Sequence, residues 1–355
     1  MGLDILIYVN DIPNDKLTQM VSSVEVNEQM DQNTTYKLIF EVDICDGDIA
    51  KSIQDDTSPN EILSVFANVK DELVCLVKGP VTRQKSHLNH GGAGSWMHIE
   101  GEDTGHNLDL KPKFRETKTG SDADIATNII SGSTQMIPDV ERTPDSTHNE
   151  NNHSHIQRES DLSLLRTLAR RNGFHFWITY SKIGLATGHF KSRSLDGEPE
   201  VDLIVNLDNY NIESLEINSD PDRPTTSQGM QLNLRTKKII DRTVKLEDTV
   251  LGDQGLADVT SSDPLSMYLG PSVDDEGAME ARIKGALREA QWFIKATCKT
   301  SLHRLGNIVR THTIVNVDGA GSKHSGKYYV TGVKHNIDAA SHIMDLEMER
   351  NGWGE

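Results

Sequence analysis

The stretch RESDLSLLRTLARRNGFHFWITY, residues 158–180, carries a helix pattern followed directly by a strand pattern. Ser160 stands before the helical stretch, where its hydroxyl can cap the first turn, and Gly173 stands where a helix can end in the left-handed conformation. FHFWITY, with its aromatic residues, is typical of a strand. This segment therefore predicts mixed α and β structure near the middle of the chain. The predicted apolar helix face consists of Leu162, Leu165, Leu168 and Ala169.

Before this segment, apolar residues recur with the period of two that is typical of half-buried strands. TYKLIFEVDI (35–44) is the clearest example, because its aromatic and aliphatic residues alternate with polar ones. Asn, Asp, Gly and Pro clusters separate these stretches, and many short strands at this spacing predict a small barrel or sandwich. The other predicted strands of this part are 3–10, 21–28, 72–81 and 95–103.

After residue 120 the pattern changes twice. SDADIATNIISG (121–132) has helical spacing, and the polar stretch 135–155 is predicted to be a loop. Strand-like alternation then returns at 201–206, 211–217, 229–235, 311–319, 327–335 and 342–350. Residues 237–276 show no sustained period and are predicted to be an insertion or long loop. A strong helix pattern follows at 277–298, where Met279, Ile283, Leu287, Phe293 and Ile294 keep helical spacing.

The sequence thus predicts a mainly β fold with an α+β insert between two similar β modules. The expected domains are a first β module at 1–112, an α+β middle domain at 113–198, and a second β module at 199–355 with the insertion at about 237–276.

Composition excludes several classes of protein. The formal net charge of −18 over 355 residues argues against nucleic-acid binding, which needs a basic surface. Such acidity suits a surface that binds basic partners, a lumen through which other molecules slide, or an ordinary soluble surface. No stretch approaches the roughly 18 apolar residues of a membrane helix, so we expect no membrane insertion. Cys45, Cys75 and Cys298 are odd in number and widely separated, which indicates reduced thiols and folding in the cytoplasm.

Motifs of catalysis and cofactor binding are absent from the sequence: it contains no nucleophile elbow, zinc-protease motif or phosphate-binding loop. The glycine stretches 91–94 and 319–322 each join two predicted strands and are predicted to be hairpin turns. Asp55-Asp56 and Asp274-Asp275 are predicted to be solvated surface. His148, His153 and His155 could supply zinc or nickel ligands, but the flanking Asn and Ser residues favour an ordinary polar loop. We therefore expect no catalytic residue, no metal site and no cofactor.

The segment 158–178 resembles a stretch of phage late-control protein D and of VgrG hub domains. Arg158, Glu159, Ser160 and Asp161 match the opening of that stretch, and Leu164, Leu165, Leu168, Gly173, Phe174, Phe176 and Trp177 match its leucine-rich helix, glycine and aromatic strand. Residues 24–40 resemble the first-barrel hairpin of that family, and 319–350, with Gly326, Tyr328, Val330, Val333, His335 and Arg350, resemble its closing hairpin. The alanines at 281, 286 and 290 match the preceding helix in kind.

This resemblance implies a phage tail baseplate hub of a contractile tail or contractile injection system. It implies a homotrimer in which two tube-like barrels per chain form a pseudo-sixfold ring that joins a sixfold tail tube to a threefold spike. The implied partners are the tail tube protein, a separate spike protein and other baseplate proteins. The implied location is the cytoplasm during assembly and then the virion tail or injection-particle baseplate. Phages, extracellular injection devices and secretion systems all remain open as the parent particle.

Two other functions stay open beside this non-enzymatic structural role. A tail-tip cell-wall hydrolase would need a cleft with titratable groups, and a host-surface or carbohydrate-binding module would need exposed aromatic residues. Aromatic residues make up only 5% of the chain, and most fall in periodic core patterns. We expect binding to be carried by the edge strands and exposed faces of the two β modules.

Overall fold

The computed structural model describes residues 4–42, 51–70, 72–90, 92–114, 116–133, 136–143, 155–233, 236–245, 250–260, 265–271, 273 and 276–354. Strands hold 47% of the residues and helices 19%, so the chain is mainly β, as the sequence predicts. No helix within these ranges is both long and apolar enough to cross a membrane.

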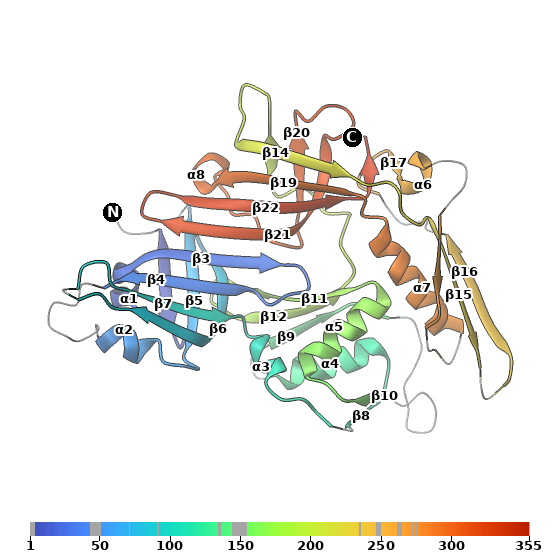
Figure 1. Ribbon diagram of the computed structural model, residues 1–355, viewed down its shortest axis with the longest axis horizontal. Helices are drawn as coiled ribbons and strands as arrows, with labels where there is room; N and C mark the ends of the chain where they lie inside the picture. Colours follow the sequence, from blue (N-terminus) through green and yellow to red (C-terminus); the bar gives the residue numbers. More distant parts are fainter. Residues whose placement is uncertain are drawn as a thin grey trace.

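Thirteen strands form one large sheet (Figure 1). They are β1 (Ile5–Val9), β2 (Ile12–Pro13), β3 (Val21–Gln29), β4 (Thr35–Glu41), β5 (Ile62–Val69), β6 (Glu72–His87), β7 (Trp96–Glu102), β13 (Asp202–Ile204), β14 (Ile212–Ser219), β19 (Ile294–Ser301), β20 (Ile314–Asp318), β21 (Gly326–Asp338) and β22 (His342–Arg350). The main path runs β14-β19-β22-β21-β3-β4-β7-β6-β5-β1-β2, with β20 paired to β21 and β13 paired to β20.

The pairing of β3 with β21 joins the two ends of the chain. Residues 23–29 of β3 lie antiparallel to residues 332–338 of β21, and we call this pairing the seam. Strands β1–β7 on one side form the N-terminal β module, and β13, β14 and β19–β22 on the other form the C-terminal β module. Valines and aromatic residues of both modules belong to one buried core, which includes Val24, Phe40, Val333 and Met344. The seam therefore lies within a shared core.

The two modules have the same arrangement on either side of the seam. Counting outward, the order is β3, β4, β7, β6 in one and β21, β22, β19, β14 in the other, with every neighbour antiparallel. Within each module the seam strand pairs with the strand that follows it in the chain. The order in which the chain visits the outer strands differs between the modules, which is why no simple sequence repeat is visible.

The prediction of two barrels needs correction. Among the described residues no sheet closes into a barrel, and the two modules share one open strand path. The physical reason is that β3 and β21 use their edges to pair with each other. An edge that pairs with the other module is satisfied without closure of its own module.

The middle region has its own core. Helices α4 (Asp122–Gly132) and α5 (Asp161–Asn172) pack on a three-stranded sheet of β9 (Met136–Val140), β11 (His175–Tyr180) and β12 (Ala186–Lys191). As predicted, Ser160 caps α5 by accepting a hydrogen bond from the Ser163 amide at 3.2 Å, and Gly173 ends it with φ 68°. The smaller elements here are α3 (His106–Asp109), β8 (Glu116–Lys118) and β10 (His155–Gln157).

The stretch 237–276, predicted to be a loop, contains regular structure. Strands β15 (Thr226–Leu232), β16 (Ile239–Lys245) and β18 (Ser266–Leu269) form a separate sheet, which we call the arm, and it packs on α7 (Glu276–Ala290). Ile240 and Val244 of β16 pack against Met279 and Ile283 of this helix. The long-loop alternative of the prediction (an insertion or long loop) was wrong, because β16 and β18 present only Ile240, Val244 and Leu269 to the helix and so show no sustained apolar period.

The long C-terminal helix ends earlier than predicted. Helix α7 stops at Ala290, and Ile294 begins β19, where Ile294, Ala296 and Cys298 alternate inward. Phe293 is buried between the two elements. The helical spacing of Phe293 and Ile294 was therefore a coincidence of two adjacent apolar elements. The remaining short elements are α1 (Asp15–Met20), α2 (Lys51–Asp56), β17 (Gln254–Gly255), α6 (Leu256–Val259), α8 (Leu302–Leu305) and β23 (Gly352–Trp353).

The second predicted glycine turn is confirmed. Gly319 and Gly321 both have φ 81° and lie between β20 and β21, where the chain reverses direction. In the first predicted glycine turn (91–94), Gly92 and Gly94 also have positive φ and connect β6 to β7. Gly91 lies outside the described residues.

Two glycines allow the middle region to contact α7 closely. A Cβ atom on Gly285 would lie 2.6 Å from the Gly173 backbone nitrogen, and one on Gly173 would lie 2.7 Å from the Gly285 Cα. Glycine inside a helix is normally unfavourable by about 1 kcal/mol relative to alanine. Its presence at position 285 therefore reflects the close approach of the two segments.

We expect Gly285→Ala to destabilise the protein by about 1–2 kcal/mol, because the backbone clash outweighs the gain in helix propensity. Gly132→Ala is the matched control, since no atom lies within 4 Å of a Cβ at that helical position. It should be neutral or stabilising by up to about 1 kcal/mol. Denaturant unfolding of both variants measures this, and equal effects would contradict the close-packing explanation.

Candidate functional site

A buried polar cluster lies at the seam. Glu28 of β3 is 3% exposed, and its carboxylate lies 2.6 Å from Nε of Arg310. Arg310 also donates to the carbonyl oxygens of Cys75 and Leu76 in β6, at 2.8 and 2.9 Å. One guanidinium from the C-terminal β module thus binds two strands of the N-terminal β module. We call Glu28, Arg310, His335 and His342 the seam cluster.

The two histidines extend the seam cluster across β21 and β22. His335 is fully buried, with Nε2 3.3 Å from Glu28 and Nδ1 3.0 Å from Nε2 of His342. Although burial alone would raise the pKa of Glu28, Arg310 and His335 together hold that pKa below its usual value. Burial lowers the pKa of His342 to about 3, so its ring is neutral at physiological pH. The Glu28 carboxylate is therefore paired with the Arg310 guanidinium at the shared core of the two modules.

A second polar cluster connects all three parts of the chain. His175 at the start of β11 lies 3.1 Å from Asp31 in the β3–β4 turn and 3.2 Å from Glu289 in α7. Arg193 lies 3.0 Å from Glu289 and 2.8 Å from Glu349 of β22. Burial alone would lower the pKa of His175, but its hydrogen bonds to the two carboxylates raise it. The middle region is thus held to both β modules by ion pairs.

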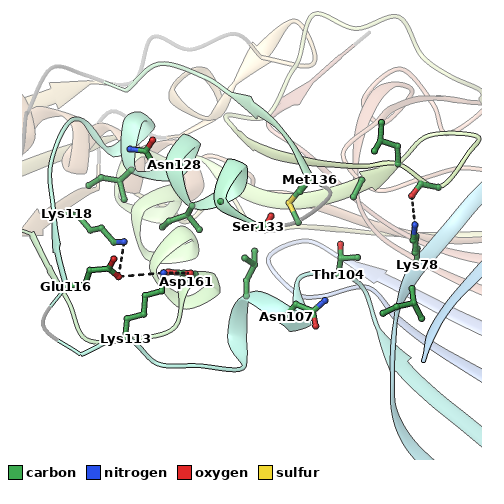
Figure 2. Close-up of a pocket in the computed structure, with 18 of the residues that line it drawn as sticks. Lys78, Thr104, Asn107, Lys113, Glu116, Lys118, Asn128, Ser133, Met136 and Asp161 are labelled. Atoms are coloured by element: carbon green, nitrogen blue, oxygen red, sulfur yellow. Dashed lines mark hydrogen bonds and ion pairs between the residues drawn. The ribbon is translucent and has the colours of Figure 1, made fainter. Parts of the chain in front are cut away.

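An open cleft lies between the N-terminal β module and the middle region. Its volume is about 1070 Å³, and Figure 2 shows its charged side chains at two ends. At one end Lys78 lies 2.6 Å from Asp11 and donates to the Gly184 carbonyl oxygen. At the other, Lys113 pairs with Asp161 at 2.9 Å and Lys118 pairs with Glu116 at 3.2 Å. Every charged side chain that lines the cleft has a partner of opposite charge, so its lining resembles a docking surface more than an active site.

The middle sheet carries one arrangement that sequence reasoning missed. Thr179 Oγ1 lies 2.7 Å from His189 Nε2, and His189 Nδ1 lies 2.8 Å from Asp139. Hydroxyl, imidazole and carboxylate in this order satisfy the distances of a nucleophile relay. Thr179 stands within a regular strand opposite Thr187, and the neighbouring cavity of about 570 Å³ is lined by Asp139 but by neither Thr179 nor His189.

The structure separates the histidines and cysteines that the sequence singled out. His155 lies in β10, whereas His148 and His153 lie outside the described residues. Within the described ranges no three His, Cys, Asp or Glu side chains form a group that could hold a metal ion. Cys75 and Cys298 are buried free thiols, and burial raises the pKa of each to about 12, so neither is a reactive thiolate; Cys45 lies outside the described residues.

The two acidic pairs also fall in different places. Asp55 and Asp56 lie in the short helix α2, and the Asp56 carboxylate accepts a hydrogen bond from the Asn14 amide at 2.8 Å. Asp274 and Asp275, just before α7, lie outside the described residues.

Comparison with known proteins identifies a matching family model and solved structures with a similar fold. A family model described as the Alg8 N-terminal domain matches residues 3–339. No curated protein matches the sequence. A tail protein from Neisseria meningitidis MC58 superposes with a TM-score of 0.69 at 14% identity, covering 99% of this chain and 97% of that protein. The 43 kDa tail protein of prophage MuSo2 from Shewanella oneidensis gives 0.64 at 13% identity, with 98% of each chain covered.

A third solved structure extends the similarity to secretion systems. A component of the type VI secretion system of E. coli gives a TM-score of 0.59 at 11% identity, covering 98% of this chain and 79% of that protein. The resemblance to phage tail and VgrG-like proteins predicted from the sequence is therefore confirmed at the level of the fold. At these identities the likeness concerns the fold alone.

The seam cluster predicts a specific loss of stability. Arg310→Met should cost about 3–5 kcal/mol in the free energy of unfolding, because it leaves Glu28 charged and buried without its partner. The double variant Glu28→Gln, Arg310→Met should be less destabilised, since both charges are removed. Arg83→Met is the matched control: its side chain is 71% exposed and 3.6 Å from Glu100, and it should change stability little. A loss below about 1 kcal/mol for Arg310→Met, measured by denaturant unfolding at fixed protein concentration, would contradict the assigned role.

Proposed function

We propose that this chain, which belongs to the family described as the Alg8 N-terminal domain, is a structural baseplate hub of a phage tail or contractile injection system. The support is the likeness of its fold to phage tail and type VI secretion proteins. The proposed role is to join the sixfold tail tube above to the threefold central spike below. The work is mechanical and involves no catalysed reaction. The proposed location is the virion tail or injection-particle baseplate, after folding in the cytoplasm.

The observation that carries this proposal is the pair of equivalent β modules on either side of the seam. Each presents the same order of antiparallel strands, and both belong to one sheet with a shared core. Three copies of such a chain around a threefold axis would present six similar faces to a sixfold tube. The same trimer would present three identical faces to the spike. A homotrimer therefore resolves the symmetry difference between tube and spike.

Each predicted domain has its own proposed contacts. Residues 1–112 and 199–355 would form the two tube-like units that contact the tail tube protein, and residues 113–198 would lie between them. The separate spike protein and other baseplate proteins would bind the exposed faces, among them the cleft between the N-terminal β module and the middle region. The acidic net charge of −18 would favour partners with basic contact surfaces.

Light scattering after size exclusion tests the oligomeric state of the purified protein. The proposal predicts a mass three times that of the 39.4 kDa chain, and class averages by electron microscopy should show a ring with six outer lobes. A ring with a different number of copies, at any concentration tested, would contradict a threefold hub. Adding the spike protein should increase the trimeric fraction, because a partner that binds only the trimer shifts the equilibrium toward it.

A cell-wall hydrolase is the second candidate, and the Thr179–His189–Asp139 arrangement is the observation that favours it. Its test is peptidoglycan release by the purified protein, compared with His189→Gln. The hub proposal predicts no release from either protein. Release that disappears in His189→Gln would overturn the hub proposal and identify the protein as an enzyme.

A carbohydrate-binding module is the third candidate, and retention on host cell-wall polysaccharide would favour it.

A further inference from the structure

The arm projects from the body at the end opposite the N-terminal β module (Figure 1). Its inner face packs on α7 so closely that a Cβ on Gly229 would lie 2.6 Å from the Met279 sulfur. The position of this sheet relative to α7 is therefore fixed. Its opposite face is left without a covering element among the described residues.

The outer face of the arm exposes four apolar side chains, beside the polar Asp241, Thr243 and Lys245 of β16. Leu232 of β15 pairs with Ile239 of β16, and Gln228, on the same face of β15 as Met230, pairs with Tyr268 of β18. Met230, Leu232, Ile239 and Tyr268 are 65%, 50%, 63% and 76% exposed. Scattered single apolar residues are normal on a surface, but four on one face of a projecting sheet mark an interaction site.

The arm is also basic within an acidic protein. Residues 235–245 contain five basic residues and one acidic residue, in a chain whose net charge is −18. Lys237 and Lys238 lie exposed at the tip between β15 and β16. At the other end of the molecule, residues 4–42 and 51–62 contain ten acidic and three basic residues. The arm of one chain is thus opposite in charge to the N-terminal β module of any other copy.

We propose that the outer face of the arm binds the N-terminal β module of a second copy of this chain. On that module β2 is the last strand of the sheet path, and no strand of the described residues pairs with its outer edge. Ile12 of β2 is 69% exposed and lies between Asp11 and Asp15, which offers an apolar contact flanked by negative charge. The arm offers the complement, an apolar face flanked by lysines.

This contact joins two different surfaces at opposite ends of the chain. Such a heterologous contact closes into a ring when the rotation between copies allows it, and otherwise makes an open chain. In the proposed hub this would be the contact between neighbouring subunits. The number of copies in the ring rests on the hub proposal. Another acidic protein as the occupant of the arm is one outcome of the test.

Two variants with complementary defects test the contact. Leu232→Ser with Lys237→Glu disables the arm, and Ile12→Ser with Asp15→Lys disables the receiving edge. All four side chains are exposed, so both variants should unfold at the same denaturant concentration as the unaltered protein. The masses of each variant and of their equimolar mixture are measured by light scattering over a range of protein concentrations.

We expect the unaltered protein to assemble and each variant alone to stay monomeric. The mixture should form a heterodimer, because one intact arm and one intact edge remain. Ile183→Ser is the matched control: it removes a side chain that is 83% exposed on the β11–β12 turn and should leave assembly unchanged. Raising NaCl from 0.1 to 1 M should reduce the assembled fraction, since the Debye length falls from about 10 to about 3 Å.

Three results would overturn or separate the two proposals. A trimer whose mass is unaffected in the arm variant overturns arm docking and leaves the hub standing. An arm-dependent dimer or open polymer supports arm docking and removes the threefold hub. A protein that stays monomeric at every concentration overturns docking to a second copy, and capture of a purified acidic tail protein by the arm would then identify a different occupant.

Discussion

The antiparallel pairing of β3 with β21 is the constraint on which the rest of the structure depends. It joins strands more than three hundred residues apart in the chain, and it merges two β modules into one sheet with one core. The pairing is reinforced from within, because Arg310 reaches from the C-terminal β module to Glu28 and to the backbone of β6. This partly buried guanidinium has these partners only when both modules are in place.

The positions of the other parts follow from the seam. The middle region contacts the C-terminal β module through the glycine pair at positions 173 and 285, and it is held to both modules by the ion pairs of His175 and Arg193. Helix α7, which these contacts fix, carries the arm on its other side. The N-terminal β module and the arm therefore lie at opposite ends of a single framework, which is the geometry that contact between successive subunits requires.

Sequence reasoning found the elements that have a long, one-sided apolar period. The helix with its cap at Ser160 and its end at Gly173 was predicted in full, and so were strands such as 342–350. It did not find the seam, because two alternating strands carry no signal that names their partner. The two modules therefore looked like two separate barrels. In the arm, the predicted strand 229–235 overlaps β15, but β16 and β18 were missed, because they present only Ile240, Val244 and Leu269 to the helix that follows them.

The polar sites were beyond sequence reasoning for the same reason. Glu28 and His335 look like ordinary polar residues in strands until β3 and β21 pair, and Thr179, His189 and Asp139 come from three strands of the middle sheet. His148, His153 and His155 were considered as metal ligands only because three histidines lie close together in the sequence. The polar clusters of this chain form where segments that are distant in sequence come into contact, so they can be recognised only once the strand pairing is known.

Amide hydrogen exchange at the seam tests most directly whether the two modules form one structural unit. If they do, amides of residues 23–29 and 332–338 that bond across the seam should exchange as slowly as those within β4 and β22, through unfolding of the whole sheet. Exchange at the seam that is orders of magnitude faster than in those neighbouring strands would show two modules that separate readily, and it would contradict the rigid pair of β modules on which the proposed hub is built.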